Sequence, residues 1–414
     1  MNIWLINPYG PIPGEGWSNY RFTMIGKNLA GTGYKLIWWT ANFSHHFKRF
    51  RSGGWLDLRV SPNFQIRLVP TSAYYKNIGL GRIKFELLFA WRVYCRAIKE
   101  SFPECIIGVD PPQIIGFLAR RLAKYFGSKL ILDVMDLWPE IFALAFPRLL
   151  KPITPIVLYP LYVIRRRNYR QADAITSLCN TYLEAAKREA PQCQITMTIF
   201  NGIDVIVFRG VNKEQDKLSP TLVQKIGQKE SGEVWLVYAG SLGNNYDIET
   251  LLQAAADLEQ RKSKIKIFIA GEGPLRGHII DFIFTHQFTN LIFLGKLSHR
   301  ELIQLYQVCD IGLCAYGPES NVAMPDKAYD YMAAGLPIVN SLRGELENFL
   351  MERQIGIQYA AGDAKSLANA LEELASDVDK RRKMAENSYK AAMMFDKQTQ
   401  YTKFIEVLQK VMSQ

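Results

Sequence analysis

The sequence lacks the features that mark disulfide-rich and metal-binding proteins. Its 414 residues include six cysteines, and no two of them form a C-x-x-C pair. Scattered cysteines of this kind are typical of buried free thiols in a reducing compartment. The five histidines show no metal-ligand spacing either. We therefore expect a cytoplasmic protein that needs no metal and no cofactor.

Long apolar segments are also missing. The longest apolar run, residues 153–164, is too short to span a bilayer and contains Pro155 and Pro160. The first residues, MNIWLINPYG, have no basic region and reach Asn7 after four apolar residues. This pattern predicts a first β-strand and not a signal peptide.

The charge of the chain is unbalanced, at +11 with a pI near 9.2. Such an excess indicates an anionic partner, which is a nucleic acid, an acidic lipid surface or a phosphorylated substrate. No recognised nucleic-acid module supports the first of these. The content of 48% hydrophobic and 21% charged residues is globular, and the length suits two α/β domains.

Short apolar runs alternate with longer helical patterns, which is typical of parallel sheets built from βαβ units. The predicted strands are residues 3–6, 35–40, 105–109, 129–134, 174–178, 234–239, 265–270, 291–294, 311–314, 337–340 and 356–359. A polar, charged stretch at 211–233 separates the two series. Residues 383–412 predict helix with a break near Phe395. We therefore predict two doubly wound domains with a site at the carboxyl ends of their strands.

A glycine-rich loop with Gly10, Gly14 and Gly16 follows the first predicted strand, and Ser18 is the expected N-cap of the next helix. Glycines let a backbone approach a ligand, and free helix N–H groups attract anions. The loop lacks the third glycine of the G-x-G-x-x-G pattern, and no acidic residue ends the second strand. A dinucleotide site is therefore disfavoured.

Seven segments carry a family resemblance. In chain order they are 132–140 (LDVMDLWPE), 172–176 (ADAIT), 201–204 (NGID), 237–242 (VYAGSL), 269–276 (IAGEGPLR), 293–295 (FLG) and 324–337 (MPDKAYDYMAAGLP). Together they resemble the family-four retaining glycosyltransferases, particularly members that build bacterial surface polysaccharides. The resemblance covers nearly the whole chain.

This resemblance implies a GT-B fold, in which two Rossmann-like domains face a central cleft. We expect an acceptor-side domain at 1–208, a donor-binding domain at 209–395 and a last helix, 396–414, that packs back on the first domain. The implied donor is a nucleotide-sugar, and the implied acceptor is a saccharide or a lipid-linked molecule. The expected donor-binding residues are Gly16, Gly240, Ser241, Gly271, Glu272, Gly273, Arg276, Pro325 and Asp330.

The sequence departs from the family pattern at the expected diphosphate site. The family usually carries an arginine directly after the glycine at 240 and a lysine five residues later, whereas this chain has Ser241 and Tyr246. We expect Lys327 to replace these cations, with Arg276 as second choice. Lys327 is then a catalytic residue, because charge on the departing diphosphate must be stabilised.

Two further departures concern carboxylates and a histidine. The second of the family's paired glutamates is Asp330 here, and the first falls near Val322. The histidine that many relatives carry before the position of Asp136 is Met135. Asp136 is the second expected catalytic residue, since a carboxylate at the cleft can orient the acceptor hydroxyl.

Each assignment has a structural alternative. Lys327 and Arg276 could be solvated helix residues, and Asp330 could cap or pair at the surface. Gly271 and Gly273 could be ordinary turn residues. Asp136 could hold the turn before Trp138.

Two basic clusters in the first half predict contact with an anionic membrane. One is the aromatic run 45–55 (HHFKRFRSGGW), and the other is Arg165 to Arg167 after the apolar stretch. Arginine, lysine and aromatic side chains suit the headgroup layer of anionic lipid. We expect a peripheral protein on the inner face of the cell membrane, and an ordinary basic surface is the alternative.

These observations predict a retaining glycosyltransferase of polysaccharide or glycan biosynthesis. One alternative is a nucleotide-sugar epimerase on the same fold. The other is a non-catalytic member of a polysaccharide assembly complex, which the missing cations suggest.

Overall fold

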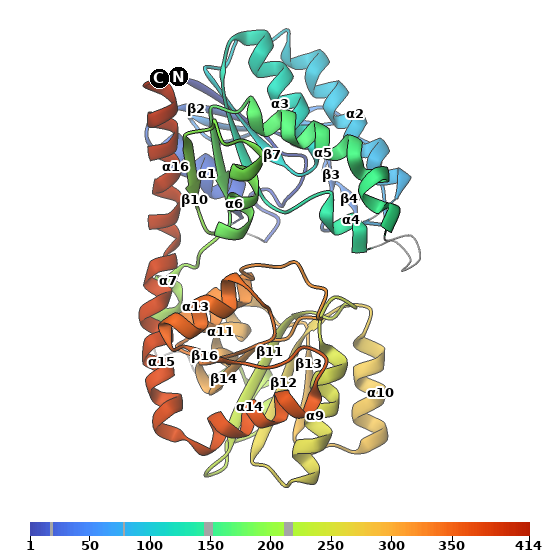
Figure 1. The fold of residues 1–414 in the computed structure, drawn as a ribbon, viewed down its shortest axis with the longest axis vertical. Coiled ribbons are helices and arrows are strands. Elements are labelled where there is room, and N and C mark those ends of the chain that lie inside the picture. Colours follow the sequence, from blue (N-terminus) through green and yellow to red (C-terminus); the bar gives the residue numbers. More distant parts are fainter. Residues whose placement is uncertain (17–19, 78, 145–151, 211–217) are drawn as a thin grey trace. The chain divides into compact units, whose positions relative to one another are not determined.

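The computed structural model describes residues 1–16, 20–77, 79–144, 152–210 and 218–414. The chain divides into two compact units. Unit 1 comprises Met1–Asn201 with Gln398–Gln414, and unit 2 comprises Gly202–Lys397. Figure 1 shows that each unit is a sheet with helices against its faces.

Unit 1 contains an eight-stranded sheet in the order β10-β9-β8-β7-β1-β2-β6-β5. Neighbouring strands are parallel except β5, which runs antiparallel to β6. The strands are β1 (Asn2–Ile6), β2 (Lys35–Ala41), β5 (Leu56–Ser61), β6 (Phe64–Val69), β7 (Cys105–Asp110), β8 (Lys129–Val134), β9 (Ala174–Ser177) and β10 (Ile195–Thr198). A separate two-stranded sheet joins β3 (Phe43–Ser44) and β4 (Arg49–Phe50).

The helices of unit 1 connect these strands, as a parallel sheet requires. They are α1 (Arg21–Gly31), α2 (Leu80–Ala97), α3 (Gln113–Phe126), α4 (Glu140–Leu144), α5 (Thr154–Arg170) and α6 (Asn180–Glu189). The long last helix, α16 (Lys397–Met412), begins at the end of unit 2 and continues in unit 1.

Unit 2 contains a six-stranded, fully parallel sheet in the order β13-β12-β11-β14-β15-β16. Its strands are β11 (Val234–Ser241), β12 (Ile265–Glu272), β13 (Leu291–Gly295), β14 (Ile311–Cys314), β15 (Ile338–Asn340) and β16 (Gly356–Gln358). Its helices are α7 (Val205–Gly210), α8 (Pro220–Ile226), α9 (Ile248–Gln260), α10 (Arg276–His286), α11 (His299–Val308), α12 (Asp326–Ala333), α13 (Glu345–Arg353), α14 (Ala364–Ser376) and α15 (Val378–Ala392).

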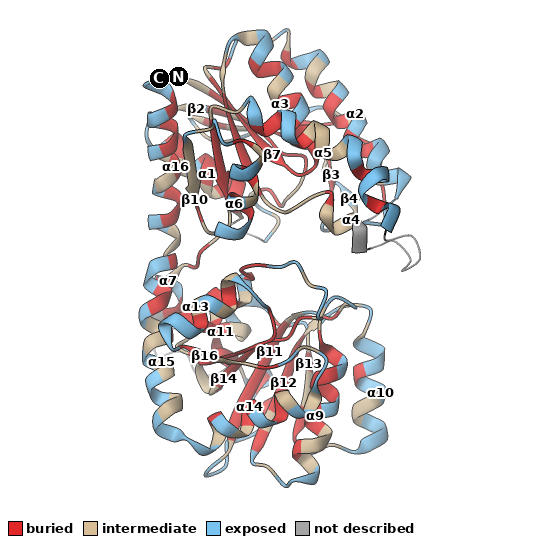
Figure 2. Ribbon diagram, in the orientation of Figure 1, coloured by how far each residue is buried: buried red, intermediate tan, exposed pale blue. Residues whose placement is uncertain are grey.

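The apolar runs form central strands because a parallel sheet is covered by helices on both faces. β7 is buried along its whole length, and β11 is buried from Val234 to Ala239. Figure 2 shows the strands buried and the outer sides of the helices exposed. All eleven predicted strands are present, and most of their ends lie within one residue of the predicted ones.

The chain passes between the two units twice, and the two passages pair with each other inside unit 2. Ile203 forms a parallel bridge with Asp396. The Ile203 N–H donates to the Phe395 carbonyl at 2.8 Å, and the Lys397 N–H donates to the Ile203 carbonyl at 2.9 Å. The helical break predicted near Phe395 is this passage, where a 3₁₀ turn at Met393–Phe395 separates α15 from α16.

Three local expectations need correction or lie outside the described residues. The pair β5–β6 and the strand β10 were not predicted from the sequence. The expected cap Ser18 lies outside the described residues, and α1 begins after Tyr20, which makes no side-chain cap hydrogen bond. The polar stretch at 211–233 is described only from 218, where α8 replaces the expected loop.

Candidate active site

The sheet of unit 2 reverses its direction of growth between β11 and β14. From β11 the chain adds β12 and β13 on one side, and it then returns to add β14 on the other side. In open α/β sheets, ligands bind at such a switch point, outside the carboxyl ends of the strands. The loops after β11, β12 and β14 and the start of α12 are therefore the candidate site.

The glycines predicted at this edge permit a close approach of two backbone segments. Gly240 and Gly271 are paired neighbours at the ends of β11 and β12. A Cβ atom at Gly271 would lie 1.9 Å from the Gly240 carbonyl oxygen, and one at Gly273 would lie 2.5 Å from the Leu242 oxygen. Gly273 also has φ +159°, a conformation that favours glycine. These contacts support the alternative that Gly271 and Gly273 are required by the turn itself.

Lys327 lies on the first turn of α12 and reaches back to the end of β11. A Cβ atom at Gly240 would lie 2.9 Å from the Lys327 Nζ. The Nζ is buried, and among the described residues it has no hydrogen-bond partner. Burial lowers the pKa of Lys327 to about 8. A buried ammonium without a partner is costly, and it points to an anionic partner other than the described residues.

Three tyrosine rings surround this ammonium. The Nζ lies 4.1 Å from the ring centroid of Tyr238 and 5.0 Å from those of Tyr246 and Tyr316. In the sequence, Tyr246 stands out only as the residue in place of a family lysine, and no motif marks Tyr238 or Tyr316. The three rings come from a strand and two loops, so only the fold brings them together.

Asp330 lies one helical turn after Lys327, next to a second lysine at the passage between units. Burial raises the pKa of Asp330 to about 7, and Asp326 raises it further, whereas Lys397 and Lys327 lower it. Burial lowers the pKa of Lys397, and Asp326, Asp330 and Asp204 oppose this change. The carboxyl group of the half-buried Asp330 can thus exist in both protonation states near neutral pH.

The other predicted donor-binding residues of unit 2 lie around this centre. Pro325 is the buried N-cap residue of α12. Ser241 ends β11, and its carbonyl accepts a hydrogen bond from the Tyr238 hydroxyl at 2.7 Å. The side chains of Arg276 and Glu272 are 55% and 50% exposed, and they approach each other to 3.5 Å. This exposure fits the alternative for Arg276 as a surface residue.

Asp136 follows β8 in unit 1 and accepts hydrogen bonds from its own loop. The Leu137 N–H donates to its Oδ1 at 2.8 Å, and the Trp138 indole N–H approaches its Oδ2 to 3.3 Å. Burial raises the pKa of Asp136. These bonds support the alternative that Asp136 holds the turn before Trp138.

The glycine-rich loop after β1 is held by an arginine that the sequence analysis assigned to a membrane surface. Arg51 donates to the Gly10 carbonyl at 2.7 Å and forms an ion pair with Glu15 at 2.7 Å. Its side chain is only 4% exposed, so the expectation that Arg51 faces lipid is wrong. Gly16 is exposed, with φ +84° and open space around its Cα.

Arg165 was also expected to face a membrane, and this expectation is wrong. Its side chain is 5% exposed and lies between Glu140, at 2.6 Å, and Glu189. The buried guanidinium also donates to the Trp138 carbonyl at 2.5 Å. Phe43 is likewise buried, whereas Arg49, Phe50, Arg166 and Arg167 are exposed.

A polar network near the carboxyl end of β1 was not found from the sequence. The Tyr9 hydroxyl donates to Glu86, and Arg82 Nε donates to that hydroxyl at 3.1 Å and to Glu86 at 3.0 Å. The Arg82 guanidinium stacks on Trp138 at 4.5 Å. The only sequence signal was the i,i+4 spacing of Arg82 and Glu86 on an expected helix.

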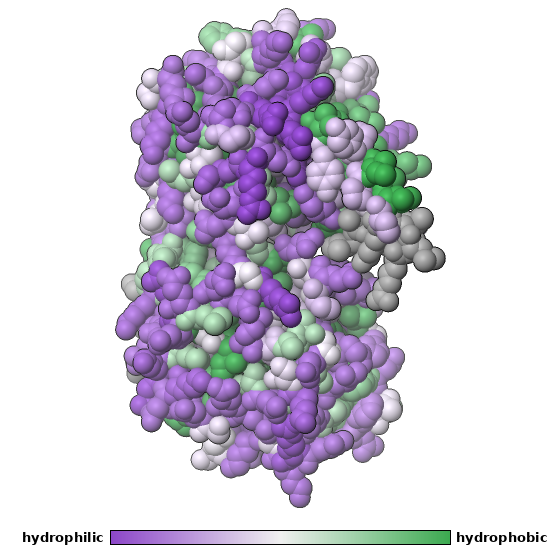
Figure 3. Space-filling view, in the orientation of Figure 1, coloured by the Kyte–Doolittle hydropathy of each residue, from purple (hydrophilic) through white to green (hydrophobic). Residues whose placement is uncertain are grey.

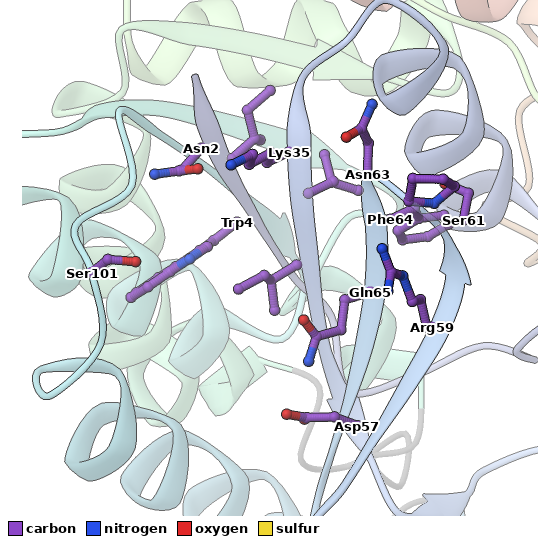
Figure 4. Close-up of a pocket in the computed structure, with 14 residues that line it drawn as sticks. Asn2, Trp4, Lys35, Asp57, Arg59, Ser61, Asn63, Phe64, Gln65 and Ser101 are labelled. Carbon is purple, nitrogen blue, oxygen red and sulfur yellow. The ribbon is translucent and has the colours of Figure 1, made fainter.

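A cavity of about 580 Å³ lies at the opposite edge of the unit 1 sheet. Figure 4 shows the residues around it, among them Asn2, Trp4, Lys35 and Gln65 from the amino-terminal ends of β1, β2 and β6. Ligands of parallel sheets bind at the carboxyl ends. The cavity is therefore not part of the candidate active site.

Comparison with known families supports a catalytic second unit. Residues 221–391 match the family model described as Glycosyl transferases group 1. An uncharacterized glycosyltransferase of Methanocaldococcus jannaschii is 25% identical over 45% of this chain and 48% of its own length. The chain thus matches about half of that relative. The putative glycosyltransferase EpsD of Bacillus subtilis is 26% identical over 84% of this chain and 88% of its own length.

Solved structures match the chain over its whole length. Sucrose-phosphate synthase from Thermosynechococcus elongatus has a TM-score of 0.74 at 16% identity, covering 100% of this chain and 99% of its own. HepE of Anabaena, solved in complex with UDP-glucose, has a TM-score of 0.67 at 17% identity, covering 99% of this chain and 100% of its own. At these identities the likeness shows the fold, and the predicted GT-B fold is confirmed.

Proposed function

We propose that the chain is a group 1 glycosyltransferase, which the match of residues 221–391 to that family model supports, and that it moves a sugar from a nucleotide-sugar donor to a saccharide or lipid-linked acceptor. The observation that carries the proposal is the buried Lys327 ammonium at the switch point of unit 2, which has no hydrogen-bond partner within the described part of the chain. Retention of the anomeric configuration and a role in polysaccharide biosynthesis rest on the resemblance of the seven sequence segments.

In this proposal Lys327 stabilises the negative charge that develops on the leaving diphosphate. The bond between the anomeric carbon and the diphosphate oxygen breaks, and a bond from that carbon to the acceptor oxygen forms on the same face. The acceptor proton passes to the departing phosphate oxygen, so the reaction balances without a protein nucleophile. The protein then contributes chiefly a fixed charge in a site where burial strengthens electrostatic interactions.

Asp330 is proposed to contact the ribose hydroxyl groups of the donor. Its raised pKa gives it both a hydrogen-bond acceptor form and a protonated donor form near pH 7. A hydroxyl group can complement either form. For Asp136, the hydrogen bonds of its own loop support a positioning role through Trp138 rather than direct contact with the acceptor.

A donor screen with the purified chain tests the proposal. Nucleoside diphosphate release and the anomeric configuration of the product are measured with a panel of nucleotide-sugars and saccharide acceptors. Transfer with retention supports the proposal. Conversion of the donor sugar with the nucleotide still attached would favour the epimerase, and binding without turnover would favour the non-catalytic assembly protein.

The same assay is expected to proceed without a divalent metal. In the second half no D-x-D-like acidic pair stands at a strand end, and we assign the diphosphate charge to Lys327. Transfer in excess chelator should therefore equal transfer in added magnesium or manganese. Activity that a chelator abolishes and a divalent metal restores would refute this prediction.

We also propose that unit 1 contacts an anionic membrane, through a surface that differs from the predicted one. Four exposed apolar side chains follow one face of α2: Leu80, Ile83, Leu87 and Trp91, which are 83%, 52%, 52% and 62% exposed. Ile156 and Tyr159 near the start of α5 are 76% and 62% exposed. Figure 3 shows apolar side chains gathered over these ends of α2 and α5.

Exposed cations and buried thiols also support contact with the inner face of an anionic membrane. Lys84 on α2 and Arg166 and Arg167 on α5 are exposed. Cys105, Cys309 and Cys314 are buried free thiols, which suit the reducing inner side of a membrane. None of the described helices has the length and hydropathy that a membrane-spanning segment needs.

The chain is expected to bind anionic vesicles at low salt and to dissociate as salt rises, because screening acts over roughly 8 Å at physiological salt. The double variant Leu87→Ser with Trp91→Ser should bind several-fold more weakly, since it removes apolar area from the headgroup layer. Phe284→Ser, at an 82% exposed site of unit 2, is the matched control. Sedimentation with vesicles measures both, and equal binding of the two variants would refute the assignment.

A further inference from the structure

The three tyrosines around Lys327 are fixed by contacts of their own. Tyr238 lies in β11, and its hydroxyl is bonded to the Ser241 carbonyl. The loop that carries Tyr246 is bonded to the loop that carries Tyr316, because the Gly317 N–H donates to the Asn245 carbonyl at 3.1 Å. The Tyr316 N–H donates to Ser341 Oγ at 2.8 Å. The Tyr238 side chain and the backbone of the two loops are therefore held by contacts that do not involve the lysine.

The arrangement is a cage of ring faces around one charge. The centroids of Tyr246 and Tyr316 lie 5.1 Å apart, and those of Tyr238 and Tyr246 lie 6.5 Å apart. Each centroid is within 5.0 Å of the Lys327 Nζ. The negative face of an aromatic ring attracts a cation, and this attraction grows when water is excluded.

A buried lysine is usually held by an ion pair or by hydrogen bonds, and both occupy its N–H groups. Among the described residues, the Lys327 Nζ forms neither. Asp330 influences it only through space. Ring faces attract a cation without offering it an oxygen or nitrogen acceptor, so the ammonium of Lys327 still lacks such an acceptor among the described residues.

We propose that Tyr238, Tyr246 and Tyr316 are positioning residues that hold the Lys327 ammonium at the Gly240 turn with its N–H groups free for the diphosphate of the donor. This inference rests on the proposed function and deepens it. This chain lacks the two cations that the family usually carries. The cage compensates for their loss, because it favours the charged form of the single buried lysine. Tyr246 occupies the position of the family lysine. In place of a positive charge, this position provides an aromatic ring that contacts the charge of Lys327.

Burial of Lys327 makes donor binding depend on pH in a defined direction. The groups that face Lys327 are the three tyrosines, Cys314 of β14 and Asp330 of its own helix. Because burial lowers the pKa of Lys327 to about 8, the amine is half charged at that pH, almost fully charged well below it and neutral well above it. Diphosphate binding should therefore weaken above about pH 8, and binding near that pH should take up a proton.

Ring removal at Tyr246 tests the cage, since this side chain is only half-buried. Tyr246→Phe keeps the ring, and Tyr246→Leu removes it while leaving an apolar surface. The first readout needs no ligand: the pKa of the Lys327 amine, from its acylation rate against pH by mass spectrometry. The wild type and Tyr246→Phe should give a pKa near 8, and Tyr246→Leu should give a lower one. An equal or higher pKa in Tyr246→Leu would overturn the proposal.

The second readout is calorimetric titration of the full chain with UDP, GDP, ADP and dTDP between about pH 6.5 and 9.5. For the nucleotide that binds, Tyr246→Leu should bind about fivefold to tenfold more weakly than Tyr246→Phe, the size expected for one lost cation–π contact. If the wild type binds none of them, the proposed function fails. If it binds one and Tyr246→Leu behaves as Tyr246→Phe, only the cage fails.

Tyr316→Leu with Tyr316→Phe repeats both readouts at a second ring. A thermal unfolding curve shows whether Tyr246→Leu folds. If it does not, the comparison of Tyr316→Leu with Tyr316→Phe tests the cage instead. Unchanged lysine pKa and unchanged nucleotide affinity on loss of the Tyr316 ring would contradict the proposal in the same way.

Discussion

Lys327→Met is expected to lower the turnover number about a hundredfold or more, equivalent to roughly 2.7 kcal/mol of lost transition-state stabilisation. Methionine keeps the apolar stem and removes the charge. The stability of the fold should be unchanged or higher, because the variant no longer buries an ammonium without a hydrogen-bond partner. Turnover is measured by nucleoside diphosphate release, and stability by thermal unfolding.

Lys365→Met is the matched control for this variant. Lys365 lies on α14 of the same unit and is exposed, so the same substitution there should change neither turnover nor the unfolding temperature by much. Near-normal turnover of Lys327→Met would remove Lys327 from the mechanism. Unfolding of Lys327→Met would show that the lysine has a structural partner.

Arg21→Ala is expected to lower the free energy of unfolding by about 3–5 kcal/mol, because it leaves a buried carboxylate without its cation. Arg21 and Asp133 are 1% and 0% exposed and form a two-bond ion pair at 2.7 and 2.8 Å. Asp133 also accepts from the Thr176 hydroxyl at 2.7 Å, and Arg21 donates to the Ile199 carbonyl at 2.5 Å. The pair thus joins α1 to β8, β9 and the segment after β10.

Denaturant unfolding measures this loss, and a double variant separates its causes. Arg21→Met with Asp133→Leu removes both charges and should recover most of the stability lost by Arg21→Ala, since paired burial contributes little net energy. A loss below about 1 kcal/mol for Arg21→Ala would mean that water reaches Asp133.

The strands of both units could be predicted because each is a short apolar run between helical patterns. β6 escaped prediction because Gln65 and Arg67 interrupt its apolar residues. Arg67 is nevertheless buried, because it pairs with Asp57 and with Glu100, each at 2.8 Å, and stacks on Trp39 at 4.8 Å. A charged residue that is buried and neutralised by two residues elsewhere in the chain looks the same in the sequence as a solvent-exposed one.

The same reason explains the errors at the predicted membrane surface. Three consecutive arginines read as one basic cluster, but successive helix residues point about 100° apart. Arg165 therefore turns inward to Glu140 and Glu189, while Arg166 and Arg167 remain exposed. The exposed apolar face of α2 could not be predicted, because the sequence does not show which side of that helix packs against the sheet.

At the candidate site, the sequence singled out Lys327 but not the side chains around it. Lys327 was predicted because two family cations were missing and a lysine followed Pro325 and Asp326. The cage depends on the pairing of β11 with β14, which brings Tyr238 near Tyr316 across a long separation in the chain. That pairing is a property of sheet order, and no local pattern encodes it.

The double passage of the chain between units has a consequence for synthesis on the ribosome. Unit 2 is a continuous segment, and all of its residues have been made once Lys397 is in place. Unit 1 lacks part of its core until α16 follows, because Tyr401, Phe404, Leu408 and Val411 are each 0% exposed there. Unit 1 is therefore begun first and completed last. Until α16 is made, the apolar side chains that it covers in unit 1 stay exposed and can bind chaperones while unit 2 is synthesised.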